Sequence, residues 1–397
     1  MSGWKWRDRK TWSRDSKTPP KAAKPTSSKR VTPPKNRPTP SAGAKGRPTP
    51  TRQQAQAEKA KAAKAAKAGG EAEAPSGGGA VAVAEKVGSV VAAARAFADD
   101  LDDSAVLAVD DGEIAFTTDS YVVQPLEFPG GDIGTLAVHG TCNDLAVAGA
   151  TPLFLTLNAF IEEGLEIALL ERIVASIARA AAETGARVVA GDTKVLRRGE
   201  GGGLYLATTG LGIRTGPRLG LDLVEHGDAI LVSGPVGDHG IAVMLAREEF
   251  GLHGEVQSDA ASVLPLTQAA MELPGLRFMR DPTRGGLATV CHELQRATGM
   301  GLRIQETRIP VRDPVQSVCD MLGYDPYYLA CEGRVLAVIA PDQAEAALAT
   351  WRKLPRGREA ARIGRIAAAE ERVILETELG GERFLEELED DPLPRIC

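Results

Sequence analysis

The stretch AVLAVDDGEIAFTTD, residues 105–119, carries the first clear strand pattern of the ordered body, which we expect to begin between about Val81 and Ala105. It contains two short apolar runs, 105–109 and 114–118, separated by the polar sequence DDGE. Apolar runs of this length, joined by a turn rich in Asp and Gly, are typical of a β-hairpin. The second strand of the predicted hairpin delivers Asp119 at its end, so a carboxylate would stand at the edge of the sheet.

Beyond this hairpin, strands and helices alternate in two series. Small and apolar residues recur at helical intervals from Asp132 to Gly149, where Gly149 and Pro152 end the predicted helix. The first series continues with a strand at 153–161, a helix at 166–184 and strands at 187–190 and 205–213. After a lapse around 216–227, the second series has strands at 229–233, 277–279, 301–305, 335–340, 362–366 and 373–375, with helices after Gly240, at 285–297 and at 343–351. The pattern predicts an α+β chain of two α/β domains, 76–216 and 217–388.

The first 70 residues differ from the rest in charge. They contain 19 Lys and Arg against 3 Asp and Glu, a balance of +16, so with a total of −6 the remainder carries about −22. The segment is rich in Pro, Lys, Ala, Ser and Thr and poor in apolar residues, which predicts a disordered extension over 1–75. Such a basic arm could bind an anionic polymer or an acidic partner, or it could be a solvated extension. We do not expect it to bind nucleic acid.

The cysteines and the hydropathy indicate an intracellular protein. Five cysteines occur without a close Cys-x-x-Cys pair, which argues against a disulfide framework and a zinc ribbon. No apolar run approaches the roughly 20 residues that a membrane-spanning helix needs, so we expect a cytoplasmic protein. The sequence closes with Pro394-Arg395-Ile396-Cys397, where the prolines favour extended backbone. Residues 389–397 are therefore predicted to form a mobile tail ending in Cys397.

Polar residues that could handle phosphate follow several predicted elements. Asp119, the pair Asn143-Asp144 and Asp192 are candidates for holding Mg²⁺ on a triphosphate, because magnesium binds through hard oxygen ligands. Aspartates also occupy turns and helix caps, and that reading remains open for each of them. Lys194 could contact a phosphate or act as an acid or base. Glycine-rich turns at 234–240 and 281–286 stand where a strand leads into a helix, a position suited to anions.

Seven segments in order resemble the HypE family, the carbamoyl dehydratases of nickel–iron hydrogenase maturation. They are 117–123, 128–134, 140–146, 191–195, 234–240, 281–286 and 394–397. The resemblance runs from about residue 100 to the last residue. It implies a fold of the aminoimidazole ribonucleotide synthetase (PurM) type, with ATP bound by the N-terminal domain of a homodimer.

The resemblance also implies a reaction and its residues. Cys397 would accept a carbamoyl group from HypF, ATP-dependent dehydration would leave a thiocyanate, and the nitrile would pass to the HypC–HypD complex as an iron ligand. Lys194 and Glu332 are implied for the dehydration step. The remaining implied site residues serve ATP: Asp119, Asp144 and Asp192 with Mg²⁺, Asn143 and Thr193 beside the phosphates, and His239 and Arg284 lining the site or contacting phosphate.

The sequence departs from the family pattern in two places. The family begins its fold with a His-Gly-x-Gly-Gly loop that covers ATP, whereas this chain has Ser76-Gly77-Gly78-Gly79 and no histidine before His139. Thr135 stands where the family often has lysine. Two alternatives therefore stay open: another ATP-dependent enzyme of the PurM superfamily, which would not explain the cysteine-ended tail, and a maturation scaffold that no longer turns over nucleotide.

Overall fold

The computed structural model describes residues 104–109, 112–247, 254–367 and 372–388, together with Leu393 and Ile396 of the tail. The predicted hairpin is confirmed: β1 (Ala105–Val109) pairs antiparallel with β2 (Gly112–Tyr121), and Ala105 lies opposite Phe116. The predicted basic extension and the predicted start of the ordered body lie outside the described residues.

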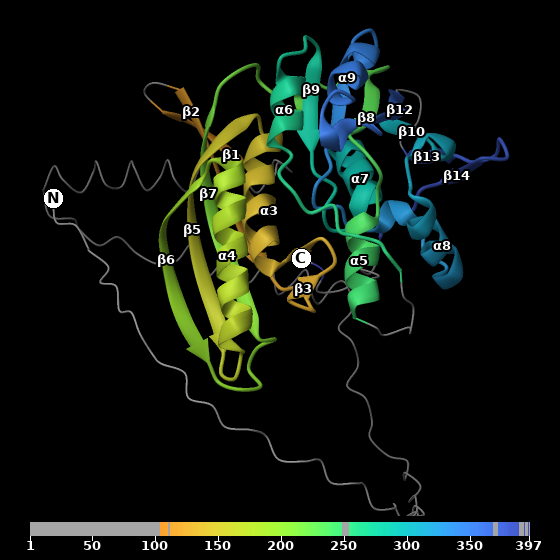
Figure 1. The fold of residues 1–397 in the computed structure, drawn as a ribbon. Helices are drawn as coiled ribbons and strands as arrows, with labels where there is room; N and C mark the ends of the chain where they lie inside the picture. The colour runs from red at the N-terminus through yellow and green to blue at the C-terminus, as the bar shows by residue number, and fades with distance from the viewer. Residues whose placement is uncertain are drawn as a thin grey trace, which may run out of the picture. The chain divides into compact units, whose positions relative to one another are not determined.

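A five-stranded sheet with two helices forms the first half of the described chain (Figure 1). Its strand order is β1-β2-β7-β5-β6, where β5 is Ala150–Glu162, β6 is Arg187–Leu196 and β7 is Leu204–Arg214. Helices α3 (Ile133–Val147) and α4 (Ile167–Thr184) pack against each other, and α3 also packs on the central strands. Asp132 caps α3 by accepting a 2.9 Å hydrogen bond from the Thr135 N–H, and almost every residue of α3 is buried.

The second half contains a seven-stranded sheet in the order β14-β13-β10-β12-β8-β11-β9 (Figure 1). The strands are β8 (Ala229–Val232), β9 (Leu276–Arg280), β10 (Gly301–Gln305), β11 (Leu336–Ile339), β12 (Ala361–Ala367), β13 (Val373–Glu376) and β14 (Glu382–Phe384). The helices are α5 (Asp238–Ala246), α6 (Leu264–Met271), α7 (Gly286–Thr298), α8 (Asp313–Leu322) and α9 (Ala344–Trp351). A two-residue ladder of β3 (Glu127–Phe128) and β4 (Gly131–Asp132) precedes α3. The described residues also contain four short 3₁₀ turns, at Leu221–Leu223, Glu306–Arg308, Pro326–Tyr328 and Pro355–Gly357. The expected two α/β series are therefore confirmed, whereas β3, β4, α6, α8 and β14 were not predicted.

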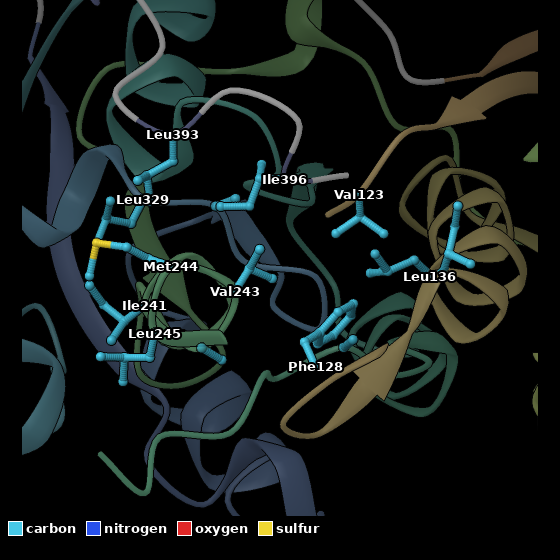
Figure 2. Close-up of a cluster of buried hydrophobic side chains, with 14 of the residues drawn as sticks. Val123, Phe128, Leu136, Ile241, Val243, Met244, Leu245, Leu329, Leu393 and Ile396 are labelled. Carbon is cyan, nitrogen blue, oxygen red and sulfur yellow. The ribbon is translucent and has the colours of Figure 1, made fainter. Parts of the chain in front are cut away.

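One hydrophobic cluster connects the two halves and includes the tail (Figure 2). It joins Val123 and Leu136 of the first half to Val243 of α5 in the second. Leu393 and Ile396 belong to the same cluster and are 6% and 3% exposed. The mobility of the tail stays a prediction, but its two described residues are packed against the body.

The predicted positions of two aspartates need correction. β2 runs on to Tyr121 and β6 runs on to Leu196, so Asp119 and Asp192 lie within strands rather than after them. The strand β6 was predicted to stop at 190, yet Gly191 and Asp192 pair with Leu157 and Asn158 of β5. None of the helices in the described ranges is long and apolar enough to cross a membrane.

Candidate active site

A cavity of about 190 Å³ lies where β2 and α3 of the first half meet two loops of the second. One of these loops follows β9 and the other precedes β11. Its lining residues are Asp119, Ser120, Tyr121, Gly140, Asp144, Asp281, Thr283, Arg284 and Glu332. Four of these are acidic and one is basic, so the cavity would repel phosphate unless carboxylates are neutralised by protons or by a cation.

Asp119 and Asp144 form the first pair of this cavity. The Thr141 hydroxyl donates a 2.7 Å hydrogen bond to Asp119 Oδ2, and the Thr117 hydroxyl donates a 2.8 Å hydrogen bond to Asp144 Oδ2. Burial raises the pKa of Asp119, although its hydrogen bonds, including one with Asp144, oppose that shift. Two carboxyl groups in such close contact share a proton or a cation, because both cannot be charged without a counterion.

Glu332 faces the same cavity from the second half. It is 2% exposed, and its Oε1 has no hydrogen-bond partner among the described residues. Burial raises the pKa of Glu332 well above its usual range, and three neighbouring carboxylates raise it further. The Glu332 backbone is held from both sides, since its N–H donates to Asp259 Oδ1 at 3.1 Å and its carbonyl accepts from Asn143 at 3.3 Å. The result is a fixed acid with a free oxygen at the cavity wall.

Asn143 sits beside Asp144 on α3 but does not line the cavity. It is 1% exposed, and its Nδ2 donates to the carbonyl oxygens of Ala261 (3.0 Å) and Glu332 (3.3 Å). Its Oδ1 accepts from the Val263 N–H at 2.9 Å. Both ends of the amide are therefore used to join α3 to the second half, and a contact between Asn143 and phosphate stays a prediction.

Asp192, Thr193 and Lys194 lie away from the cavity on the exposed edge strand β6. Lys194 Nζ is 2.6 Å from Asp192 Oδ2, and both side chains are more than half exposed. The sheet register runs from Ser120 through β7 and β5 to Asp192, which is three strand spacings or roughly 14 Å. Asp192 also shares its sheet face with Ser120 rather than with Asp119, because side chains alternate along a strand.

His239 is buried at the start of α5 and contacts the tail instead of the cavity. Its Nε2 lies 2.8 Å from the Ile396 carbonyl oxygen, and its Nδ1 lies 2.8 Å from Ser258 Oγ. The role of His239 at phosphate therefore stays a prediction. The structure brings together Asp119, Asp144, Arg284 and Glu332 from the sequence-predicted set, while Cys397 lies outside the described residues. Within the described ranges, no group of three or more His, Cys, Asp and Glu is arranged to hold a metal ion.

Several residues of the site were not singled out from the sequence. Tyr121 and Asp281 line the cavity, and both stand inside motifs used for the family resemblance, so their position beside Asp119 and Arg284 was an available signal. Asp259 and Arg334 had no such signal. Arg334 lies between Asp238 (3.3 Å) and Asp259 (3.2 Å) in a buried ionic group, which Asp259 connects to the Glu332 backbone.

The segment 258–263 supports both sides of the site. Ser258 contacts His239, Asp259 holds the Glu332 backbone, and Ala261 and Val263 bond to Asn143. The segment has no regular secondary structure, and no sequence period marks it. Its position is fixed by side-chain hydrogen bonds to residues that are distant in the sequence.

Comparisons with known proteins agree with this architecture. Residues 101–214 match the model of the AIR synthase related protein N-terminal domain, and residues 225–376 match that of its C-terminal domain. The carbamoyl dehydratase HypE of Azotobacter vinelandii is 45% identical over 302 residues, which cover 75% of this chain and 89% of that protein. HypE of Escherichia coli K12 is 42% identical over 296 residues, which cover 74% and 88%.

Solved structures show the same relationship. A HypE–HypF complex matches with a TM-score of 0.70 and 41% identity, over 73% of this chain and 94% of that one. HypE in complex with ATP matches with a TM-score of 0.69 and 44% identity, over 75% and 90%. Thiamine monophosphate kinase from Aquifex aeolicus has a TM-score of 0.55 at 17% identity, over 75% of this chain and 98% of that one, and shares the fold alone. With its two AIR synthase related domains and relatives of this identity and coverage, the chain belongs to the HypE family of carbamoyl dehydratases.

Proposed function

We propose that this chain dehydrates a carbamoyl group carried on its own Cys397 to a thiocyanate, using ATP, and so supplies the cyanide ligand in hydrogenase maturation. The observation that carries the proposal is the placement of the tail. Ile396 packs in the same apolar cluster as Tyr121, and Tyr121 lines the acidic cavity. The names of the relatives and the ATP complex of one of them support the same activity.

The reaction balances as a phosphoryl transfer followed by elimination. The carbamoyl oxygen attacks the terminal phosphoryl group of ATP, and ADP leaves. The carbon–oxygen bond then breaks, the oxygen departs in inorganic phosphate, and two protons leave the nitrogen as the triple bond to carbon forms. The enzyme must therefore neutralise phosphate charge and accept protons at one place.

The cavity residues fit the first need. Asp119 and Asp144 offer hard oxygen ligands, and Mg²⁺ commonly binds through one or two carboxylates together with phosphate oxygens. Bound Mg²⁺ would neutralise charge on the transferring phosphoryl group. Arg284 adds a fixed positive charge at the cavity wall. The volume of about 190 Å³ is below the 300–1,000 Å³ of ordinary ligand pockets, so the nucleotide would extend beyond this cavity.

Glu332 meets the second need. Its Oε1 is free and buried in the cavity wall, and burial raises its pKa. A carboxyl group with a raised pKa is a stronger base than an ordinary carboxylate, and it holds an accepted proton near neutral pH. We assign the deprotonated form of Glu332 to removal of a proton from the carbamoyl nitrogen.

Lys194 would reach such a site from a second copy of the chain. It lies on the exposed strand β6, whose outer edge pairs with no strand of the described ranges, among exposed apolar residues that include Val188, Val189 and Val195. Exposed apolar strand edges are typical of interfaces. We propose a homodimer in which this surface is covered and in which Asp192, Thr193 and Lys194 approach the nucleotide of the partner copy.

The resemblance to the HypE family implies the remaining partners. The carbamoyl donor is HypF, which one related structure contains in complex with HypE. A thiocyanate nitrile needs an acceptor that takes up cyanide, and we assign the HypC–HypD complex to that role. Because ATP and the hydrogenase precursor would both be needed, we place the reaction in the cytoplasm.

The test follows the mass of the tail. The full chain is carbamoylated at Cys397 with HypF, Mg-ATP is added, and the C-terminal peptide is analysed by mass spectrometry. The peptide should lose the mass of one water only when both Mg²⁺ and ATP are present. A carbamoyl adduct that persists under these conditions would identify a maturation scaffold, and transfer of phosphate to a free small molecule would identify a kinase-like enzyme.

A further inference from the structure

The tail is held through the residue that precedes Cys397. The Ile396 side chain is 3% exposed within the cluster of Figure 2, where Val123 and Val243 are among its members. The Ile396 carbonyl oxygen lies 2.8 Å from His239 Nε2. Ile396 is therefore held in two ways, by packing of its apolar side chain and by a hydrogen bond to its backbone carbonyl.

The hydrogen bonds around His239 run in one direction. A carbonyl oxygen can only accept, so His239 Nε2 donates to Ile396. Burial lowers the pKa of His239, which favours a neutral ring whose Nδ1 accepts from the Ser258 hydroxyl. Ser258 Oγ in turn accepts from the Ala260 N–H at 3.0 Å. Each polar atom in this series of hydrogen bonds has a partner, so the imidazole is already oriented to donate to a carbonyl oxygen.

The position of His239 is also fixed by packing. Its ring lies edge-on to Phe128, with 5.4 Å between the ring centroids and an interplanar angle of 84°. The backbone N–H of Ser258 donates to Pro129 at 2.8 Å. The loop between β3 and β4 thus holds both the histidine and its orienting serine.

We propose that His239, Ser258, Val123 and Val243 form a socket, here called the Ile396 socket, that positions an extended peptide segment by its Ile396 side chain and carbonyl. The segment is the tail of this chain, 393–397. The proposal rests on the proposed function only where it concerns Cys397 as the reacting group. His239 acts as a positioning residue through Ile396, because it contacts the tail at the Ile396 carbonyl and does not line the cavity.

The socket has a direct consequence for the order of events. Cys397 follows Ile396 in the sequence, so the thiol cannot travel far while Ile396 is seated. Carbamoylation by another enzyme therefore requires Ile396 to leave the socket, and dehydration at the cavity of its own chain is favoured when Ile396 is seated. Weakening the socket should speed the first step and slow the second.

Digestion by carboxypeptidase tests the socket without any need for dehydratase activity. The protease must draw the last few residues into its own cleft, so it cleaves only tails whose Ile396 has left the socket. The rate of loss of Cys397 and Ile396 is followed by intact mass for the full chain and for a free peptide of residues 391–397. Each tail variant is compared with its own free peptide.

The wild-type tail should be cleaved more slowly than its peptide. His239→Ala should raise the rate roughly fivefold, as expected for the loss of one hydrogen bond. Ile396→Asp should raise the cleavage rate about a hundredfold, with the rate of its own free peptide as the upper limit. His239→Gln can donate an N–H to the same carbonyl and should restore part of the protection. His226→Ala, at an exposed histidine, is the matched control and should leave the rate unchanged.

The result that overturns the socket is a wild-type tail cleaved as fast as its free peptide. Equal rates for wild type and His239→Ala, in chains with the same melting temperature, would also reject the role of His239. If His239→Ala has a lower melting temperature, Ser258→Ala and Ile396→Asp carry the same comparison. As a second readout, His239→Ala should speed carbamoylation by HypF and slow dehydration, whereas general damage to the fold would lower both rates. Normal tail protection without dehydration would instead reject the proposed function and leave the socket intact.

Discussion

Replacing Asn143 should destabilise the fold before it affects nucleotide binding. Asn143→Ala removes three buried hydrogen bonds between α3 and the second half, to Ala261, Glu332 and Val263. A typical buried hydrogen bond contributes about 1 kcal/mol, and leaving the Val263 N–H unsatisfied adds roughly 1–3 kcal/mol. The free energy of unfolding should therefore fall by about 4–6 kcal/mol. In a chain of this size, that loss lowers the melting temperature by roughly 10 °C.

Thermal scans of wild type, Asn143→Ala and Asn143→Asp would measure this loss. Asn143→Asp keeps the shape of the side chain but turns a carboxylate oxygen toward two carbonyl oxygens, so it should cost at least as much as alanine. The control is Asn158→Ala on β5, because Asn158 is half-buried and its side chain makes no hydrogen bond to the described residues. An unchanged melting temperature for Asn143→Ala, together with weaker ATP binding in calorimetry, would refute the structural role and favour a phosphate contact.

Three further predictions concern the cavity and the dimer. Burial raises the folded pKa of Glu332, so the folded chain keeps a proton that the unfolded chain gives up above about pH 4.5, and stability is lost as the pH rises toward the folded pKa. Glu332→Gln should therefore melt at a higher temperature than wild type at pH 8 but not at pH 4, and it should lack dehydratase activity; equal melting curves at pH 8 would contradict the raised pKa. In Gly140→Ala the added Cβ would lie 2.3 Å from the Tyr121 hydroxyl oxygen, so urea unfolding should show a loss of about 1–3 kcal/mol despite a helix-propensity gain of roughly 1 kcal/mol. Tyr121→Phe in the same chain should restore part of it, and a net gain for Gly140→Ala alone would show that the helix shifts freely. Lys194→Met should leave the melting temperature of the dissociated single chain unchanged, because Lys194 and its partner Asp192 are exposed there. Lys194→Met and Glu332→Gln should each be inactive alone, and mixing them should restore activity in dimers that contain one chain of each. If the mixture stays inactive, Lys194 and Glu332 serve the site of the same chain.

The elements with a strong local pattern were predictable from the sequence. The hairpin 105–119 and helix α3 follow from apolar period and turn residues, and the structure confirms them. Helices α6 and α8 were missed because each begins with a proline in its first turn, at Pro265 and Pro314. Proline reads as a break in a sequence pattern, although the first helical turn accepts it well.

The extent of β6 depended on its neighbour. Gly191 and Asp192 are turn-forming residues, so the pattern predicted that the strand would end before them. In the sheet, both pair with β5, and this pairing outweighs local preference. The sheet face that Asp192 occupies was likewise not predictable from local sequence, since it depends on the register with β5.

The candidate site was predictable only in part. The motifs placed Asp119, Asp144 and Arg284 among the candidates, and the family resemblance added Glu332; the structure gathers these four around one cavity. Local sequence could not show that Asn143 turns away from it or that His239 meets the tail, because those contacts span 120 and 157 positions in the chain. Segment 258–263 carries no period at all, and only its long-range hydrogen bonds reveal its importance.

That segment gives the molecule a thermodynamic link between two events. Ser258 supports the histidine that holds Ile396, and the next residue, Asp259, supports the backbone of Glu332. If the segment shifts when the cavity is loaded, both contacts change together, and we expect seating of the tail and loading of the cavity to share a coupling free energy. Such coupling is reciprocal: if nucleotide binding tightens the hold on the tail by some factor, a seated tail tightens the hold on nucleotide by the same factor. An empty cavity would then release the tail toward its carbamoyl donor, and a filled one would retain it.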